Sequence, residues 1–318
     1  MAPQPADSKI SPPSSRLWSL FRVFAPTIIA LASIRWGSQG LVILESVLSS
    51  RNGPSTGLPA GTIQAQMATK SADLAVVSSM TTMDALRTRY AASCPDHQFR
   101  TSIFSSDPVI IYIENYLSPQ EIEYLLQVAT PLYQKSPVSQ GKRLKTYNAE
   151  IRSSMSAVLG TSDPVVRCIE QRSVDFQGFM PLRHLEDLQV VKYGISDHFR
   201  PHFDWFGGDA NPRISSFFVY LACDGGRTGD GEMCKGGATQ FPDYRGRFPA
   251  RWCRFIDCHD DSGVGGVAFR PIPGNAIFWA NLYPNGTGHP GVWHAGMPVR
   301  EGRKVGMNIL TRRDVLDS

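Results

Sequence analysis

The segment FRPHFDWFG, residues 199–207, places a histidine and an aspartate two positions apart among aromatic residues. Alternate side chains of a β-strand share one face, so His202 and Asp204 would point the same way if this segment is a strand. An imidazole and a carboxylate that converge in this way make half of a metal site. Because an isolated H-x-D is more often a solvated strand edge, a metal site requires a further ligand elsewhere in the chain.

His294 is the best candidate for that ligand, since it lies in GVWHAGMPVREGRKVGMNIL, where a turn feeds a final strand. Lys304 follows it by ten residues. A lysine buried beside a metal is costly unless it meets an anion, which indicates a carboxylate-bearing co-substrate. Two histidines, one carboxylate and open coordination positions are the facial triad of non-haem Fe(II) oxygenases. The remaining histidines fall in a linker, a polar stretch, turns or a cysteine-rich insert: His97, His184, His198, His259 and His289.

Residues 188–312 resemble the catalytic domain of the prolyl 4-hydroxylase alpha-subunit family of Fe(II)/2-oxoglutarate dioxygenases. The matching segments occur in the family's order: LQVVKYG, FRPHFDWF, RISSFFVYLAC, GGATQFP, PIPGNAIFWANL and HAGMPVREGRK. H-x-D, G-G-A-T-x-F-P and H-A-G-x-P-V, with a lysine ten residues after the second histidine, form a highly specific set. Upstream, the part from Pro108 through IRSSMSAVL at 151–159 matches the helical N-terminal half of that domain more loosely.

The resemblance implies an α+β fold, a double-stranded β-helix (jelly roll) with supporting N-terminal helices and a metal at its mouth. It implies that three residues bind Fe(II): His202, Asp204 and His294. It also implies that Lys304 holds the distal carboxylate of 2-oxoglutarate. Three further residues match positions that line the co-substrate pocket: Tyr193, Tyr220 and Thr239. Gly236 and Gly237 are expected to allow a tight turn.

The activity that the resemblance implies is hydroxylation of an unactivated C–H bond by O2 and 2-oxoglutarate, with release of succinate and CO2. The expected substrate is peptidyl proline, as it is for procollagen-proline 4-dioxygenase. Ascorbate is expected as a further cofactor. The same chemistry on a small metabolite is one alternative, and a jelly-roll binding module without catalysis is another. A zinc hydrolase with the same three ligands is a further alternative, but it would not explain the presence of Lys304. Nothing in the sequence predicts an oligomeric state.

Two positions depart from the family pattern: Phe199 stands where tyrosine is usual, and Ser216 where threonine is usual. The first change removes a hydroxyl from the co-substrate or substrate side, and the second is mild. Inserts at 225–235 and 243–263 lie where substrate-facing loops would differ. These departures put the identity of the substrate in question more than the chemistry.

The elements that must position these residues follow from the hydrophobic pattern. SPQEIEYLLQVA begins with Ser118 as helix N-cap and Glu121 three residues on, which predicts a capping box after the strand DPVIIYIENYL. From residue 188 the chain is mostly β, with short β-branched or aromatic runs separated by Gly and Pro. The pattern therefore predicts a β-rich catalytic half.

Composition changes along the chain predict three regions. Residues 1–48 are expected to be a disordered N-terminus with a signal- or anchor-like apolar run, VFAPTIIALASI, at 23–34. Residues 49–100 are rich in Ser, Thr, Gly and Ala and predict a linker. Residues 101–318 are expected to form the dioxygenase domain. A cleaved secretory signal, a single-pass membrane anchor and a mitochondrial presequence all remain open for the apolar run.

The charge distribution gives no sign of a nucleic-acid partner, because the 32 basic and 28 acidic residues are scattered and the net charge is only +4. The six cysteines, by contrast, suit a disulfide framework, with Cys253 and Cys258 the first pair to expect. Disulfides and the sequon at Asn285 favour the secretory pathway, in the membrane or lumen of the endoplasmic reticulum. Reduced buried cysteines and a weak zinc site remain alternatives, the latter formed by Cys234, Cys253, Cys258 and His259.

Overall fold

The computed structural model describes residues 82–139, 145–225, 233–246, 248–258 and 265–315. The predicted N-terminal apolar run lies outside these residues. Among the described residues, no helix has the length and apolar character needed to cross a membrane.

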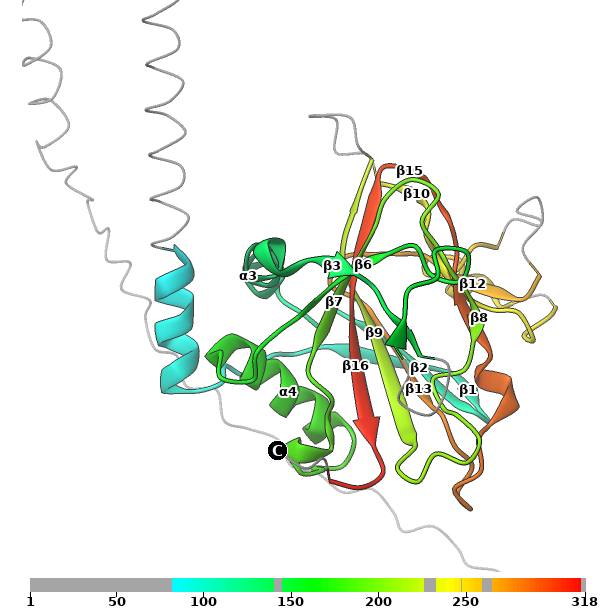
Figure 1. The fold of residues 1–318 in the computed structure, drawn as a ribbon, viewed down its shortest axis with the longest axis horizontal. Helices are drawn as coiled ribbons and strands as arrows, with labels where there is room; N and C mark the ends of the chain where they lie inside the picture. Colours follow the sequence, from blue (N-terminus) through cyan, green and yellow to red (C-terminus); the bar gives the residue numbers. More distant parts are fainter. Residues whose placement is uncertain (1–81, 140–144, 226–232, 247, 259–264, 316–318) are drawn as a thin grey trace, which may run out of the picture. The chain divides into compact units, whose positions relative to one another are not determined.

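A large antiparallel sheet of eight strands forms the frame of the domain (Figure 1). Its order across the sheet is β1 (Arg100–Ser106), β2 (Val109–Glu114), β13 (Ala276–Ala280), β9 (Arg213–Asp224), β16 (Arg303–Arg312), β7 (Gln189–Tyr193), β6 (Met155–Val158) and β3 (Gln134–Lys135). The β-branched and aromatic runs that predicted strands from residue 188 onward all lie in strands of this sheet or of the smaller sheet. The chain passes from β7 through β8 (Phe199–His202) of the smaller sheet to β9, and β16 lies between β7 and β9 in the large sheet, which is the crossed connectivity of a jelly roll.

A second antiparallel sheet of four strands carries the H-x-D segment. Its order is β12 (Val267–Phe269), β11 (Thr239–Phe241), β14 (His294–Gly296) and β8 (Phe199–His202). Two short ribbons complete the β-structure: β10 (Lys235–Gly236) with β15 (Val299–Glu301), and β4 (Val138–Ser139) with β5 (Lys145–Thr146).

The alternation of side chains along β9 shows how the large sheet is covered on both faces. Phe218 and Tyr220 belong to a core that also contains Phe241 and Phe269 of the second sheet, so this core lies between the two sheets. Phe217, Val219 and Leu221 point to the other face and join a core with the helices. Two packed antiparallel sheets with helices on the outside are the predicted double-stranded β-helix.

Helices α3 (Pro119–Ala129) and α4 (Pro164–Phe176) supply that outer layer. The predicted capping box is present: the Glu121 backbone N–H donates to the Ser118 hydroxyl at 3.2 Å, and the Ser118 N–H donates to the Glu121 carboxylate at 2.8 Å. The Asp163 carboxylate caps α4 by accepting hydrogen bonds from the Val165 and Val166 N–H groups. Single 3-10 turns join other elements: η1 (Thr130–Leu132), η2 (Leu182–His184), η3 (Ala250–Trp252) and η5 (Pro290–Val292).

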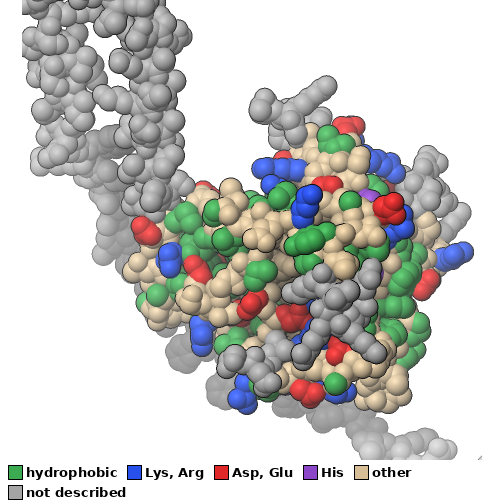
Figure 2. Space-filling model, viewed as in Figure 1, with side chains coloured by type: hydrophobic (Ala, Val, Ile, Leu, Met, Phe, Trp, Pro, Cys, Tyr) green, Lys and Arg blue, Asp and Glu red, His purple; other side chains and the backbone are tan. Residues whose placement is uncertain are grey.

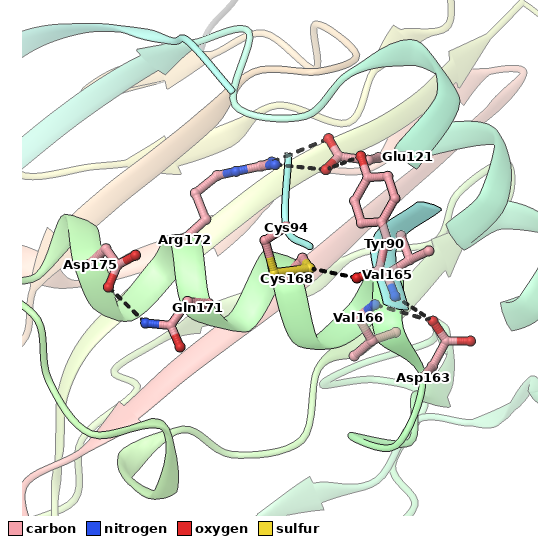
Figure 3. The surroundings of a disulfide bond; sticks show 10 residues. All are labelled: Tyr90, Cys94, Glu121, Asp163, Val165, Val166, Cys168, Gln171, Arg172 and Asp175. Carbon is pink, nitrogen blue, oxygen red and sulfur yellow. Dashed lines mark hydrogen bonds and ion pairs between the residues drawn. A yellow bond between two sulfur atoms is a disulfide. The ribbon is translucent and has the colours of Figure 1, made fainter. Parts of the chain in front are cut away.

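The packed domain begins earlier than residue 101, because residues 82–92 form a helix that is attached to α4. Cys94 and Cys168 form a disulfide, and the Tyr90 hydroxyl donates to the Glu121 carboxylate at 3.0 Å (Figure 3). Arg172 of α4 neutralises the same fully buried carboxylate at 2.7 Å. The linker prediction for 49–100 is therefore wrong for residues 82–100, since the short helix packs Met83, Leu86 and Tyr90 against the core and is attached by a disulfide to a residue 74 positions away.

All six cysteines are paired, as Cys94–Cys168, Cys223–Cys234 and Cys253–Cys258. The expected pairing of Cys253 with Cys258 is confirmed. The alternatives of reduced cysteines and of a zinc site are wrong, because a sulfur in a disulfide is not a thiolate ligand.

Removing the Cys94–Cys168 bridge by a double substitution to serine should lower the free energy of unfolding by roughly 4 kcal/mol, since it closes a loop with a sequence separation of 74. The Cys253–Cys258 bridge spans a separation of only 5, and the same substitution there should cost about 2 kcal/mol. Urea denaturation of both variants measures the difference. Equal losses would contradict a dominant loop-closure effect.

Charged side chains on the face in Figure 2 are mixed in sign, with Lys and Arg interspersed among Asp and Glu. The exposed ion pairs of the described residues include Lys235–Glu301 and Arg303–Asp224. Pairs of this kind keep the local field low and add little stability.

Candidate metal centre

The two predicted histidine ligands lie opposite each other in the second sheet. His294 of β14 pairs with His202 of β8, and their ring centroids are 4.3 Å apart. Each Nδ1 lies against a backbone carbonyl, that of Arg200 at 2.8 Å for His202 and that of Val292 at 2.9 Å for His294. A carbonyl oxygen can only accept, so each Nδ1 carries a proton, and Nε2 is the ring nitrogen left to bind a metal in the neutral tautomer.

Asp204 completes the triad from a bend beyond the end of β8. Its Oδ1 is 3.7 Å from His202 Nε2 and its Oδ2 is 3.9 Å from His294 Nε2. One ligand atom from each of the three residues lies within 4.8 Å of the other two. The three side chains do converge, but not through strand alternation as the sequence suggested. Chain direction changes after His202, and a hydrogen bond from Ser216 holds the carboxylate in place.

The charges of the triad suit a divalent metal. Burial lowers the pKa of His202, so its imidazole is neutral at neutral pH and free to donate a lone pair. Burial opposes the charge of Asp204, but attraction to His294 and His202 in their charged forms, attraction to Arg213 and the hydrogen bond from Ser216 lower the pKa of its carboxyl group. Neutral imidazoles and an ionised carboxylate are the protonation states that metal binding requires.

Lys304 of β16 is fully buried, and its neighbours across the large sheet are Tyr193 and Cys223. Its Nζ lies 4.4 Å from the centre of the Tyr193 ring and 5.2 Å from that of Phe218. Among the described residues, no hydrogen-bond partner reaches this nitrogen. Burial lowers its pKa to about 7. An ammonium with aromatic contacts and no anion is a costly arrangement that a bound carboxylate would relieve.

The depressed pKa of Lys304 predicts that the metal-free protein gains stability as pH rises. Below pH 7 both the folded and the unfolded chain hold the proton, and the full cost of burying the charge is present. Between about 7 and the ordinary value of 10.5 the folded state releases the proton while the unfolded state keeps it, so the free energy of unfolding increases. Lys304→Met should lower the increase of the free energy of unfolding per pH unit by up to ~1.4 kcal/mol, as measured by urea titrations at pH 7, 8 and 9. The same pH dependence in both proteins would contradict this prediction.

The other predicted co-substrate residues differ in the availability of their polar groups. Tyr193 is buried and carries the cation–π contact. The Tyr220 hydroxyl is already engaged, 2.8 Å from Thr239 Oγ1 and 3.1 Å from the Phe269 carbonyl. Gly237 has a φ of +69°, and a Cβ there would lie 3.3 Å from Lys304 Cδ. A side chain at this position would crowd the lysine stem, so the glycine permits the close approach as well as the turn.

Aromatic side chains enclose the triad on several sides. The Trp279 ring is 4.7 Å from that of His294, and Phe203 packs against both Trp205 at 4.7 Å and Trp293 at 4.6 Å. Phe199, the residue that departs from the family pattern, stacks on His202 at 3.7 Å. Such walls exclude water and strengthen electrostatic interactions inside the site.

Two residues near the site were missed by sequence reasoning. Arg152 is buried with its guanidinium 4.7 Å over the Phe199 ring, and it donates to Ser154 Oγ at 2.9 Å. Asn281 is fully buried and donates to Ser216. Neither lies in a motif with its own chemistry, and only the placement of segment 151–153 beside β8 and the turn after β13 brings them to the triad.

The donor set fits an Fe(II) centre with a dicarboxylate co-substrate. Two neutral nitrogens and one carboxylate oxygen suit a borderline metal and leave three octahedral positions open. The buried Lys304 ammonium, which has no hydrogen-bond partner among the described residues, supplies a place for a carboxylate.

Comparison with known proteins agrees with this chemistry. Residues 188–312 match the 2OG-Fe(II) oxygenase superfamily. The chain is 31% identical over 210 residues to a protein named probable prolyl 4-hydroxylase 10 from Arabidopsis thaliana, covering 64% of this chain and 68% of that protein. It is 30% identical over 208 residues to prolyl 4-hydroxylase subunit alpha-1 from Gallus gallus, covering 62% of this chain and 34% of that one.

Among solved structures, the 2OG complex of a viral collagen prolyl hydroxylase from Paramecium bursaria Chlorella virus-1 is similar, with 22% identity and a TM-score of 0.44 over 64% of this chain and 95% of that one. The sequence relationship, together with the triad and the buried lysine, identifies the chemistry as that of an enzyme that uses Fe(II), 2-oxoglutarate and O2. The chain belongs to the prolyl 4-hydroxylase family of 2OG-Fe(II) oxygenases.

Proposed function

We propose that this protein hydroxylates peptidyl proline in a reaction that couples O2 and 2-oxoglutarate to succinate and CO2. The observation that carries the proposal is a facial triad in a fold that also holds a fully buried lysine without a hydrogen-bond partner among the described residues. Relatives of about one-third identity whose names describe prolyl 4-hydroxylases support proline as the substrate.

The roles of the residues follow from their positions. His202, Asp204 and His294 would hold Fe(II), which supplies the oxidising chemistry when it is bound. Lys304 would neutralise the distal carboxylate of 2-oxoglutarate, so that the co-substrate is oriented by one ion pair in a water-poor pocket. The Tyr193 ring would contact the lysine ammonium, while Tyr220 and Thr239 would shape the pocket wall. The aromatic side chains around the triad would keep bulk water from the reacting C–H bond.

The experiment that tests this function measures succinate formed by the purified chain with Fe(II), ascorbate and 2-oxoglutarate, with and without a library of proline-containing peptides. Succinate that rises with particular peptides, together with hydroxyproline found in them by mass spectrometry, is the expected result. Slow succinate formation that no peptide stimulates would instead favour a small-molecule substrate. No succinate from protein with bound iron would overturn the proposal in favour of a binding module.

We also propose that the chain enters the secretory pathway, in the lumen or membrane of the endoplasmic reticulum. Three disulfides support an oxidising compartment. The sequon supports it too, because Asn285 is exposed in a turn where the Thr287 hydroxyl donates to its side-chain oxygen at 2.7 Å. Glycosidase treatment of the full chain from cultured cells should shift its mobility, and Asn285→Gln should abolish the shift. Import into mitochondria without glycosylation would contradict the proposal.

A possible single-pass anchor is part of the same proposal. Alkaline carbonate extraction of membranes from those cells separates an anchored chain, which stays in the pellet, from a chain that is soluble in the lumen.

A further inference from the structure

The Asp204 carboxylate is held by a hydrogen bond from another element of the fold. Ser216 lies in β9, is fully buried, and its Oγ is 2.6 Å from Asp204 Oδ2. Ser216 faces Trp279 in the register of β9 and β13, which fixes the position of its Cα. The bend that carries Asp204 is thereby tied to the large sheet through one side-chain contact.

Ser216 is itself contacted by a fully buried amide. Asn281 follows β13, and its Nδ2 is 2.9 Å from Ser216 Oγ. The amide nitrogen can only donate, so the serine oxygen accepts from it and must direct its own proton to Asp204. If the amide were turned around, two oxygen acceptors would compete for one serine proton and one contact would have none. Only the observed orientation supplies a proton for each contact.

Asn281 cannot easily move away, because its backbone is bonded in both directions. Its N–H donates to the Ile214 carbonyl at 2.8 Å, and its carbonyl accepts from the His289 N–H at 2.8 Å. The donor side chain is therefore presented from a fixed backbone position in the turn that leads toward His294. One end of this turn orients Asp204 through Ser216, and the other end supplies the second histidine ligand.

We propose that Asn281 and Ser216 are positioning residues that fix the rotation of the Asp204 carboxylate, so that Oδ2 is held by the serine and Oδ1 is left to hold the metal. Asn281 acts only through Ser216, by setting the direction of its hydroxyl proton. This inference deepens the proposed function, because it rests on the same triad as the metal site. Residues that orient the ligands of a metal commonly affect its affinity by about 10- to 100-fold.

The test measures Mn2+ affinity by electron paramagnetic resonance on the full-length protein, with Mn2+ as a redox-stable substitute for Fe(II). Ser216→Ala should weaken Mn2+ binding by roughly 10- to 100-fold. Ser216→Thr keeps the hydroxyl and should stay close to the parent protein. Asn281→Leu keeps the size of the side chain but not its donor, and should weaken binding in the same direction by a smaller factor.

Two matched controls separate a specific effect from general damage. Ser215 is a buried serine on the same strand whose hydroxyl donates to Gln177 rather than to the triad. Asn275 lies before β13, and its amide donates to the Tyr112 hydroxyl at 3.0 Å. Ser215→Ala and Asn275→Leu should leave Mn2+ affinity unchanged, and thermal unfolding without metal measures how much each substitution disturbs the fold.

A double-mutant cycle decides whether Asn281 acts through Ser216. In the Ser216→Ala background, Asn281→Leu should weaken Mn2+ binding no further. Additive losses of Mn2+ affinity would show that Asn281 does not act through Ser216. Unchanged Mn2+ affinity in Ser216→Ala would also overturn the proposal. If the parent protein itself did not bind Mn2+ or Fe(II), the proposed metal site would be wrong. That result differs from metal binding that Ser216→Ala leaves unchanged, which would contradict the positioning role alone.

Discussion

Asp204→Ala should abolish 2-oxoglutarate-dependent succinate formation. The substitution removes the only carboxylate of the triad and leaves two neutral imidazoles, which together hold a divalent metal weakly. It also leaves the Ser216 hydroxyl without its acceptor. The expected result is loss of turnover at every co-substrate concentration, together with loss of tight Fe(II) binding measured by metal analysis after gel filtration.

An isosteric pair provides the control for this prediction. Asp204→Asn preserves the shape of the side chain but removes its charge, and should be nearly as inactive as the alanine variant. Asp197→Asn makes the same chemical change at a carboxylate that accepts the Gly194 N–H at 2.8 Å and does not touch the triad. It should retain full turnover. Activity in Asp204→Asn equal to that of Asp197→Asn would exclude Asp204 as a metal ligand.

Lys304→Met should raise the KM for 2-oxoglutarate by roughly 30-fold to several thousand-fold. This range follows because loss of one partner from a buried ion pair costs about 2 to 5 kcal/mol, and each ~1.4 kcal/mol is a factor of ten. Methionine has a similar length and no charge, so the side chain can still pack against the Tyr193 and Phe218 rings that the ammonium contacts. Initial rates of succinate formation across a range of co-substrate concentrations measure the change.

The same substitution should stabilise the protein when no co-substrate is present. In that state the Lys304 ammonium is fully buried without an anion among the described residues, and methionine removes the cost of its desolvation. A higher melting temperature with a weaker co-substrate affinity is a combination that general damage to the fold cannot produce.

Lys192→Met is the matched control for this experiment. Lys192 lies on neighbouring β7, and its Nζ is 4.5 Å from the Tyr133 ring. The KM of this variant should not change. A normal KM in Lys304→Met would show that the lysine does not bind the co-substrate.

The sequence by itself determined the chemistry, because that chemistry depends on residue types at fixed spacing. H-x-D, a later histidine and a lysine ten residues beyond it, together with the family resemblance that these motifs carry, predict the metal ligands and the anion partner before the fold is known. The strands from residue 188 were also predictable, since β-branched and aromatic runs between glycines and prolines have few alternative conformations. The capping box at Ser118 was predictable for the same reason, as it is a contact between near neighbours in the chain.

Only the tertiary structure decided which distant residues support that chemistry. Asn281 reaches Ser216 across 65 positions of the chain, and the helix at 82–92 is attached through a disulfide that spans 74. Strand alternation was the wrong reason for the convergence of His202 and Asp204, because a bend and a hydrogen bond from β9 place the carboxylate. Local sequence patterns indicate the residue types available for chemistry and the local secondary structure. Contacts between remote segments depend on sheet register and packing, which no local pattern contains.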